Sequence, residues 1–334
     1  MADATAETDD VLDELITRAD LDALVRLVDQ RAAQGDWDGL ARARHRARWA
    51  VGTGRQLWPV ATLAEYRLAL HAPAPWAAGT LTEDAGRFTP GPLPEVAAST
   101  HTWNELAPHL PEGTGSPIAV VVAHERVVRG EDLRDSGVDD DVFELPLVLQ
   151  PWEPAYPLAT YTDDGLEAPS PRYPVTSPIE LPATTGVAAV DDPDSHRALR
   201  DLVAPWTVES NGRCDVAVVD GGVADAIAAL GVPSARSGRL SAAEALAWLA
   251  WAGASGGAHG RRRGAAAGRA AAWWVMATLG DVSPGDPVAI AATLERLRWW
   301  WWDTAEPASG WELRLAVEDP AEGIAWAIAA TDST

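Results

Sequence analysis

The sequence contains no lysine and only one cysteine among its 334 residues. Without lysine, the chain has no P-loop or kinase lysine to contact nucleotide phosphates, and no amine to form a Schiff base or to link pyridoxal phosphate. Cys214 alone forms neither an intramolecular disulfide nor a zinc site that needs two thiolates. The histidines show no spacing of metal ligands. We therefore expect no cofactor and no metal site, and a location in the reducing cytoplasm.

Basic residues are also few compared with acidic ones. The chain has 26 arginines against 49 aspartates and glutamates, which gives a formal net charge of -23. A field of that sign repels phosphate polymers and anionic bilayers, so general nucleic-acid binding and membrane binding are not expected. The apolar stretches are too short or too charged to span a membrane, and the opening residues MADATAETDD lack the apolar core of a signal peptide.

The spacing of apolar residues and the distribution of prolines along the chain predict a mixed α+β fold with three regions. Residues 1–72 carry apolar side chains at three- and four-residue steps, which is typical of a helical region. Residues 73–193 hold 18 of the 25 prolines and are expected to form short strands and ordered loops. Residues 194–334 alternate helix and strand, so we expect an α/β region that ends in a β-hairpin. Residues 73–334 could equally form one domain.

Two apolar runs and a tryptophan-rich run carry more local predictions. The β-branched runs at residues 118–128 and 142–149 favour buried strands. Pro287, capped by Asp286, is expected to begin a helix that also carries four consecutive tryptophans, residues 299–302. Four consecutive helical residues cannot face one core, so we expect Trp300 and Trp302 to contact a partner chain or a ligand, and an oligomer is left open. The alternative is that neighbouring elements of the chain cover both sides of this helix.

The segment GASGGAHGRRRGAAAGR, residues 253–269, is the strongest candidate site. One helix containing all six of its glycines would be destabilised by about 6 kcal/mol, so we expect a loop after Gly253 and a second helix over residues 258–279. Backbone N–H groups at the start of that helix could bind a phosphate or carboxylate. The side chains that would assist them are His259, Arg261, Arg262, Arg263 and Arg269. Alternatively, the arginines pair with the chain's own acids and the glycines only allow two helices to pack closely.

Two isolated residues are weaker candidates. Asp220 ends a buried strand and precedes two glycines, the position where open α/β sheets bind ligands, although it could simply cap the next helix. His124 could act as a general acid or base, or could be a structural histidine. The pattern GASGG also matches the hydrolase motif G-x-S-x-G at Ser255, but the helix expected before it and the lack of a suitable later histidine argue against a hydrolase.

Four segments resemble a family of uncharacterised proteins from high-GC actinobacteria: LPEVAASTHTWNEL, VVAHERVVRGEDL, LPLVLQPWEPAYPL and GGAHGRRRGAAAGRAAAWW. The family is one of unknown function, so the resemblance implies no activity, cofactor or catalytic residue. From the residues themselves, we expect a soluble binding or interaction protein whose Arg/Gly-rich segment meets an anionic small molecule or an acidic protein partner. The alternative is an enzyme acting on an anionic metabolite near Asp220 and Arg261–Arg263, with His124 or His259 as proton carrier.

Overall fold

Apolar residues at helical spacing build the first of two units, here called the helical unit. The computed structural model describes residues 2–140, 142–183, 186–304 and 310–333. The helical unit comprises Met1–Arg126, Ser136–Asp139 and Thr160–Glu167, so residues 73–126 of the proline-rich region fold with the N-terminal helices. Its elements are α1 (Ala2–Arg18), α2 (Leu21–Gln34), α3 (Trp37–Gly52), α4 (Trp58–His71), α5 (Ala74–Ala78), α6 (Leu93–Thr100), α7 (Trp103–Leu106), the 3-10 turn η1 (Ala107–His109), α8 (Pro117–Val127), β1 (Thr160–Thr162) and β2 (Gly165–Glu167).

The second unit, the sheet unit, comprises Val127–Asp135, Asp140–Ala159 and Ala168–Thr334. Its strands form one antiparallel sheet in the order β3-β6-β7-β8-β9-β5-β4, and β8 and β9 form the hairpin expected at the end of the chain. The chain is therefore mixed α+β, as the sequence predicts. The elements are β3 (Ser177–Ile179), β4 (Ala188–Ala189), α9 (Pro193–Leu202), α10 (Ala204–Val208), β5 (Arg213–Asp220), α11 (Val223–Ala229), β6 (Ala235–Leu240), α12 (Ala242–Ala254), α13 (Ala265–Gly280), α14 (Pro287–Arg296), β7 (Arg298–Asp303), β8 (Trp311–Asp319) and β9 (Ile324–Asp332).

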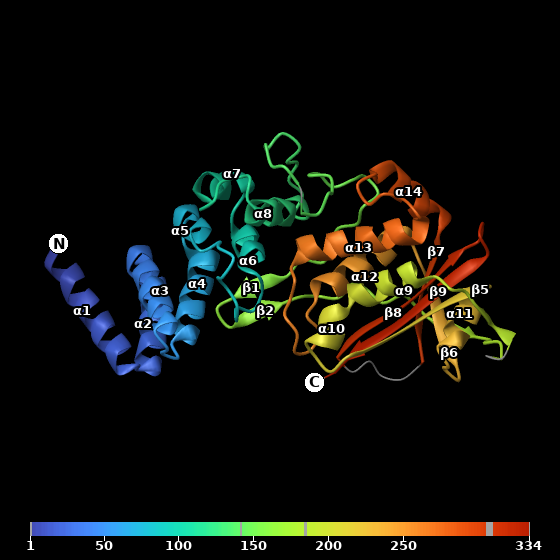
Figure 1. Cartoon of the computed structure of the whole chain (residues 1–334), viewed down its shortest axis with the longest axis horizontal. Coiled ribbons are helices and arrows are strands. Elements are labelled where there is room, and N and C mark those ends of the chain that lie inside the picture. Colours follow the sequence, from blue (N-terminus) through green and yellow to red (C-terminus); the bar gives the residue numbers. More distant parts are fainter. Residues whose placement is uncertain (1, 141, 184–185, 305–309, 334) are drawn as a thin grey trace. The chain divides into compact units, whose positions relative to one another are not determined.

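Helices cover both faces of this sheet. On one face α9, α12, α13 and α14 enclose the larger core, and on the other α11 covers a smaller one (Figure 1). The four tryptophans explain why both faces can be apolar. They lie on strand β7 and not on the predicted helix, which ends at Arg296. Because strand side chains alternate, Trp299 and Trp301 enter the larger core, whereas Trp302 enters the smaller one.

The two predicted strands of the proline-rich region are corrected by the structure. Residues 118–127 belong to α8, which begins at Pro117. The hydroxyl of Ser116, just before the helix, accepts a hydrogen bond from the Ala119 N–H (3.2 Å). A helix that is apolar on most sides cannot be distinguished from a strand by periodicity alone. Residues 142–149 form no strand among those that the structure describes, because Pro146 lacks an N–H and the carbonyls of Pro146 and Val148 accept hydrogen bonds from a buried arginine instead.

Glycine brings α12 and α13 together, although over a shorter helix than predicted. α13 begins at Ala265, not near residue 258, because Gly264 has a non-helical φ of +97°. A β-carbon built at Gly268 would lie 2.2 Å from the backbone oxygen of Ala250. The close approach expected of two small-residue helices is therefore present, while Gly260 and Gly264 lie outside the helix.

Replacing Gly268 with alanine tests this contact. In an exposed helix, Gly→Ala stabilises by about 1 kcal/mol, but at Gly268 the added methyl group would push against the Ala250 carbonyl. We expect Gly268→Ala to lower the free energy of unfolding by about 1–3 kcal/mol in urea denaturation. The control is Gly52→Ala, at the end of α3, where a β-carbon meets nothing within 4 Å. Stabilisation by both variants would contradict close packing.

Candidate functional site

The loop between α12 and α13 binds the chain's own carboxylates. The N–H of Ala258 donates to Asp332 Oδ2 (2.6 Å), and the N–H of Arg261 donates to Glu209 Oε2 (3.0 Å). The N–H of His259 donates to the hydroxyl of Ser210 (3.2 Å). These backbone donors are the ones that we expected to face a phosphate or carboxylate ligand. They are not at a helix N-terminus, and internal acceptors already occupy them.

The side chains of the Arg/Gly-rich segment are not gathered at one point. His259, Arg261 and Arg263 are exposed and Arg262 is half-buried. Arg263 borders a separate shallow hollow that also contains Trp274, which is 54% exposed. The segment therefore presents several cations on the surface of the sheet unit, without a common pocket around them.

Arg269 is a core residue and not part of a surface anion site. Its side chain is 0% exposed, and its Nε and Nη2 donate to the two carboxylate oxygens of Glu153 (2.8 Å each). Glu153 also accepts hydrogen bonds from Tyr156 Oη (2.5 Å) and Trp273 Nε1 (3.1 Å). The guanidinium lies 5.3 Å from the ring of Trp273, a cation-π contact that the i, i+4 spacing of the two residues on α13 permits. Burial alone would raise the pKa of Glu153, but the hydrogen bonds and charge of Arg269 outweigh it and hold that pKa below its usual value.

The other predicted residues also lie apart. Asp220 is exposed at the end of β5, about 23 Å from Arg213 at ~3.3 Å per residue. The loop that holds Arg261 is at the Arg213 end, because its partner Asp332 follows the residue that pairs with Arg213. His124 is 0% exposed on α8 of the helical unit. Asp220 and the arginines therefore do not share one cleft.

The two tryptophans expected at an interface differ in environment. Trp302 is 1% exposed, and its Nε1 donates to the carbonyl of Leu315 (3.3 Å). Trp300 is half-buried, with the guanidinium of Arg239 4.9 Å from its ring centre. The neighbouring elements of the chain thus cover much of this pair.

Two hollows along β5 hold polar residues that sequence reasoning did not single out. The first, the arginine hollow, has a volume of about 450 Å³. Its lining comes from α9, α10 and the start of β5: Arg200, Thr207, Gly212, Arg213, Cys214 and Asp215. Within the described parts of the chain, neither Arg200 nor Arg213 forms an ion pair or a side-chain hydrogen bond. Nothing in the sequence distinguishes these arginines from solvated ones, because the lack of a partner is a property of the tertiary structure.

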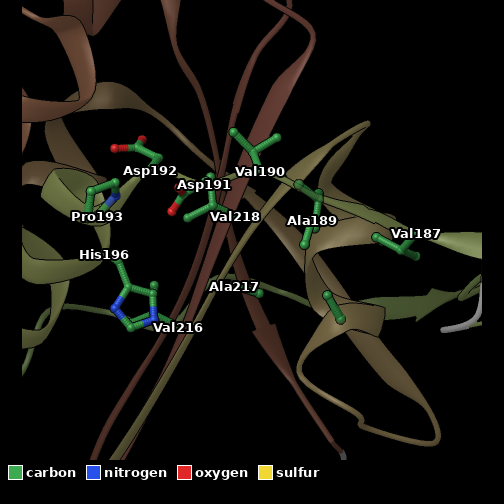
Figure 2. Close-up of a pocket in the computed structure, with 12 residues that line it drawn as sticks. Val187, Ala189, Val190, Asp191, Asp192, Pro193, His196, Val216, Ala217 and Val218 are labelled. Carbon is green, nitrogen blue, oxygen red and sulfur yellow. The ribbon is translucent and has the colours of Figure 1, made fainter.

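The second, the aspartate hollow, has a volume of about 460 Å³ and lies farther along the same strand. Figure 2 shows His196 of α9 beside Val216, and Asp191 beside Val218. Asp192 caps α9 by accepting a hydrogen bond from the Ser195 N–H (3.1 Å), with Pro193 as the first residue of the helix. The same Asp-Pro pattern was recognisable at Asp286.

Cys214 is the nucleophile nearest to these arginines, and its chemistry is suppressed. Burial raises the pKa of the Cys214 thiol to about 12, and the charge of Arg200 compensates only in part. The thiol is therefore neutral at physiological pH and too weak a nucleophile for covalent catalysis. The lining of this hollow therefore combines two guanidinium groups with a neutral thiol.

Comparisons with known proteins point to a family and to no activity. A protein-family model described as a family of unknown function (DUF6183) matches residues 22–334. Neither the curated proteins nor the solved structures contain a match to the chain. In the ranges that the structure describes, no helix is both long and apolar enough to cross a membrane, and no group of three or more His, Cys, Asp or Glu side chains could hold a metal ion. The origin in actinobacteria stays a prediction.

Removing the buried guanidinium should destabilise the sheet unit. Arg269→Met leaves the Glu153 carboxylate in the core without its cation, and we expect a loss of about 3–5 kcal/mol in the free energy of unfolding. The double variant Arg269→Met/Glu153→Met should regain much of that loss, whereas the exposed control Arg197→Met should have little effect. In the unchanged protein, the contribution of ionised Glu153 is complete above pH ~4.3 and declines as the pH falls. Equal stability of Arg269→Met and the control would refute the role of the pair.

The raised pKa of Cys214 predicts slow alkylation of the folded protein. Iodoacetamide reacts with the thiolate form of cysteine. The rate of Cys214 alkylation should therefore stay low through pH 9 and rise only as the pH approaches about 12. In urea, the same cysteine should react with the profile of an ordinary thiol, with a midpoint near pH ~8.5. A folded protein with that ordinary midpoint would show that the thiol is not buried as described.

Proposed function

The chain belongs to the family of unknown function DUF6183, and we propose that it is a binding protein whose sheet unit engages an anionic group at the arginine hollow. The anion is a carboxylate or phosphate on a small molecule or on a protein partner. The observation that carries this proposal is the pair of arginines, Arg200 and Arg213, that share a hollow without an internal carboxylate partner.

The feature that singles out Arg200 and Arg213 is that two unpaired arginines line one hollow, because other arginines, such as Arg197, also lack a partner among the described residues. Elsewhere the carboxylates neutralise guanidinium groups: Arg67 pairs with Asp29 and Asp163, and Arg296 pairs with Asp319. A guanidinium with free N–H donors is well suited to bind carboxylate or phosphate oxygens.

The electrostatics of the hollow favour a small anion over a polymer. Arg200 and Arg213 contribute two positive charges and Asp215 one negative charge, while the Cys214 thiol is neutral. The lining is therefore positive at short range, although the net charge of -23 repels anions at long range. A single carboxylate or phosphate group can reach such a site, whereas a nucleic acid would meet the repulsive field along its length.

The Arg/Gly-rich segment lies at the same end of β5 as the arginine hollow. The residues directly after α10, Glu209 and Ser210, accept hydrogen bonds from its N–H groups, and Thr207 of α10 lines the hollow. The guanidinium of Arg261 therefore adds positive charge at this end of the sheet unit. The enzyme that we weighed as an alternative would need Asp220 beside these arginines, so their separation along β5 favours binding over catalysis.

Anion titrations of two arginine variants test the proposal. We expect acetate and inorganic phosphate to stabilise the protein in thermal-shift assays and to bind in calorimetry at low salt. Arg200→Ala/Arg213→Ala should weaken binding by about tenfold or more, because charge-assisted hydrogen bonds are lost. Comparing the affinities for acetate and for phosphate shows which anion the hollow prefers.

The matched control is Arg197→Ala, which removes an exposed guanidinium from the same helix, α9, outside the hollow. Its affinity for both anions should stay within about twofold of the unchanged protein. Anion binding that is equally weakened by the control, or untouched by the double variant, would refute a site at the arginine hollow.

A further inference from the structure

Strand β5 has an open edge between the two hollows. On one side it pairs with β9 along its whole length, from Arg213 opposite Thr331 to Asp220 opposite Ile324. On the other side β4 pairs only with Val219 and Asp220. The next residue after β4, Val190, donates its N–H to the Val218 carbonyl (3.0 Å). Within the described ranges, residues 213–217 therefore have no neighbouring strand on this side.

The register shows which backbone groups the edge leaves open. In an antiparallel ladder, the N–H and C=O of one residue point to the same side, and successive residues alternate. Because the Val218 carbonyl points toward β4, the N–H and C=O groups of Val216 and Cys214 also point away from β9. Across the described residues, no hydrogen bond satisfies these four groups. Such an edge is a template for another strand.

The open edge lies in a groove and not on a flat surface. Residues 212–215 line the arginine hollow and residues 216–219 line the aspartate hollow. Side chains of a strand alternate, so four consecutive residues line one hollow only where the hollow faces the strand edge. The opposite wall is one face of α9, from which Pro193, His196 and Arg200 project at positions i, i+3 and i+7.

The charges of the groove set the direction of an occupant. Arg200 and Arg213 lie at the start of β5, and the exposed Asp191 lies beside Val218 farther along it (Figure 2). A strand added antiparallel to β5 would run from the aspartate hollow to the arginine hollow. Its C-terminal end would then meet the two guanidinium groups, and its N-terminal end would meet the aspartate.

We propose that the groove between β5 and α9 binds the extended C-terminal residues of a partner polypeptide, which add as a strand to β5 and place the terminal carboxylate in the arginine hollow. This inference rests on the proposed anion-binding function and names its ligand. The groove combines β-strand addition with capture of a C-terminal carboxylate, two established modes of peptide recognition. About five residues fit the open length, with small apolar side chains against Val190 and Val216.

Synthetic pentapeptides and the full chain provide the test. The probe is an acetylated pentapeptide of alternating valine and threonine with a free C-terminus, compared with its C-terminal amide by calorimetry. We expect the amide to bind about tenfold more weakly, and Arg200→Ala/Arg213→Ala to remove that difference. Methylation of alternate amide nitrogens should weaken binding about tenfold, while methylation of the intervening nitrogens should not, since only alternate N–H groups face β5.

The variant Val216→Pro tests the contribution of the β5 edge to peptide binding independently of the arginines. This substitution removes an N–H that points away from β9, so the β5–β9 ladder keeps its hydrogen bonds. It should weaken the peptide about tenfold and leave acetate binding unchanged. Independently of that variant, peptide should protect the Cys214 and Val216 amides of the unchanged protein from hydrogen exchange at least tenfold, whereas acetate should not.

The outcomes distinguish this inference from the function on which it rests. If acetate binds through Arg200 and Arg213 but acid and amide peptides bind alike, or the two amides gain no protection, the peptide inference fails and the anion site stands. If neither acetate nor peptide binds, both fail. If sedimentation shows a dimer that Val216→Pro dissociates, the edge binds a second copy of this chain, and the peptide inference is overturned.

Discussion

One buried ion pair orders the core of the sheet unit. Arg269 on α13 and Glu153 in the proline-rich segment meet at 2.8 Å with no exposure to solvent. Either charge alone would be strongly unfavourable there, so the two segments must be placed together. The remaining donors of Arg269 bind the carbonyls of Pro146 and Val148, which have no strand partner. In this way a segment without regular structure is held against the helices that cover the sheet.

The same scarcity of cations underlies the proposed anion site. Acidic residues outnumber arginines, and they satisfy even the backbone donors of the Arg/Gly-rich loop through Asp332 and Glu209. A loop that reads as an anion site in the sequence thus becomes a junction between elements. Arg200 and Arg213, two arginines with free donors that line one hollow, come from segments far less conspicuous in composition.

Local signals predicted many of the elements, and their failures have physical reasons. The cap at Asp286 begins a helix where expected, and a capping box of Ser241 and Glu244 begins α12 before the Arg/Gly-rich segment, where a helix was also expected. Residues 118–128 were misassigned because a helix buried on most sides shows no amphipathic period. The tryptophans 299–302 were placed on a helix because the helical pattern before them continues without a break signal. In the fold, pairing with β6 and β8 makes them a strand.

The sequence by itself determined the mixed α+β class, the helical beginning, the hairpin at the end, the excluded lysine and disulfide chemistry, and the contact of Arg269 with Trp273. These follow from composition and from spacing within one element, which the chain carries locally. The tertiary structure alone decided which arginines lack a carboxylate and which strand ends with an open edge. Both depend on segments distant in sequence, since pairing of charges and of strands is a relation between residues that only folding brings together.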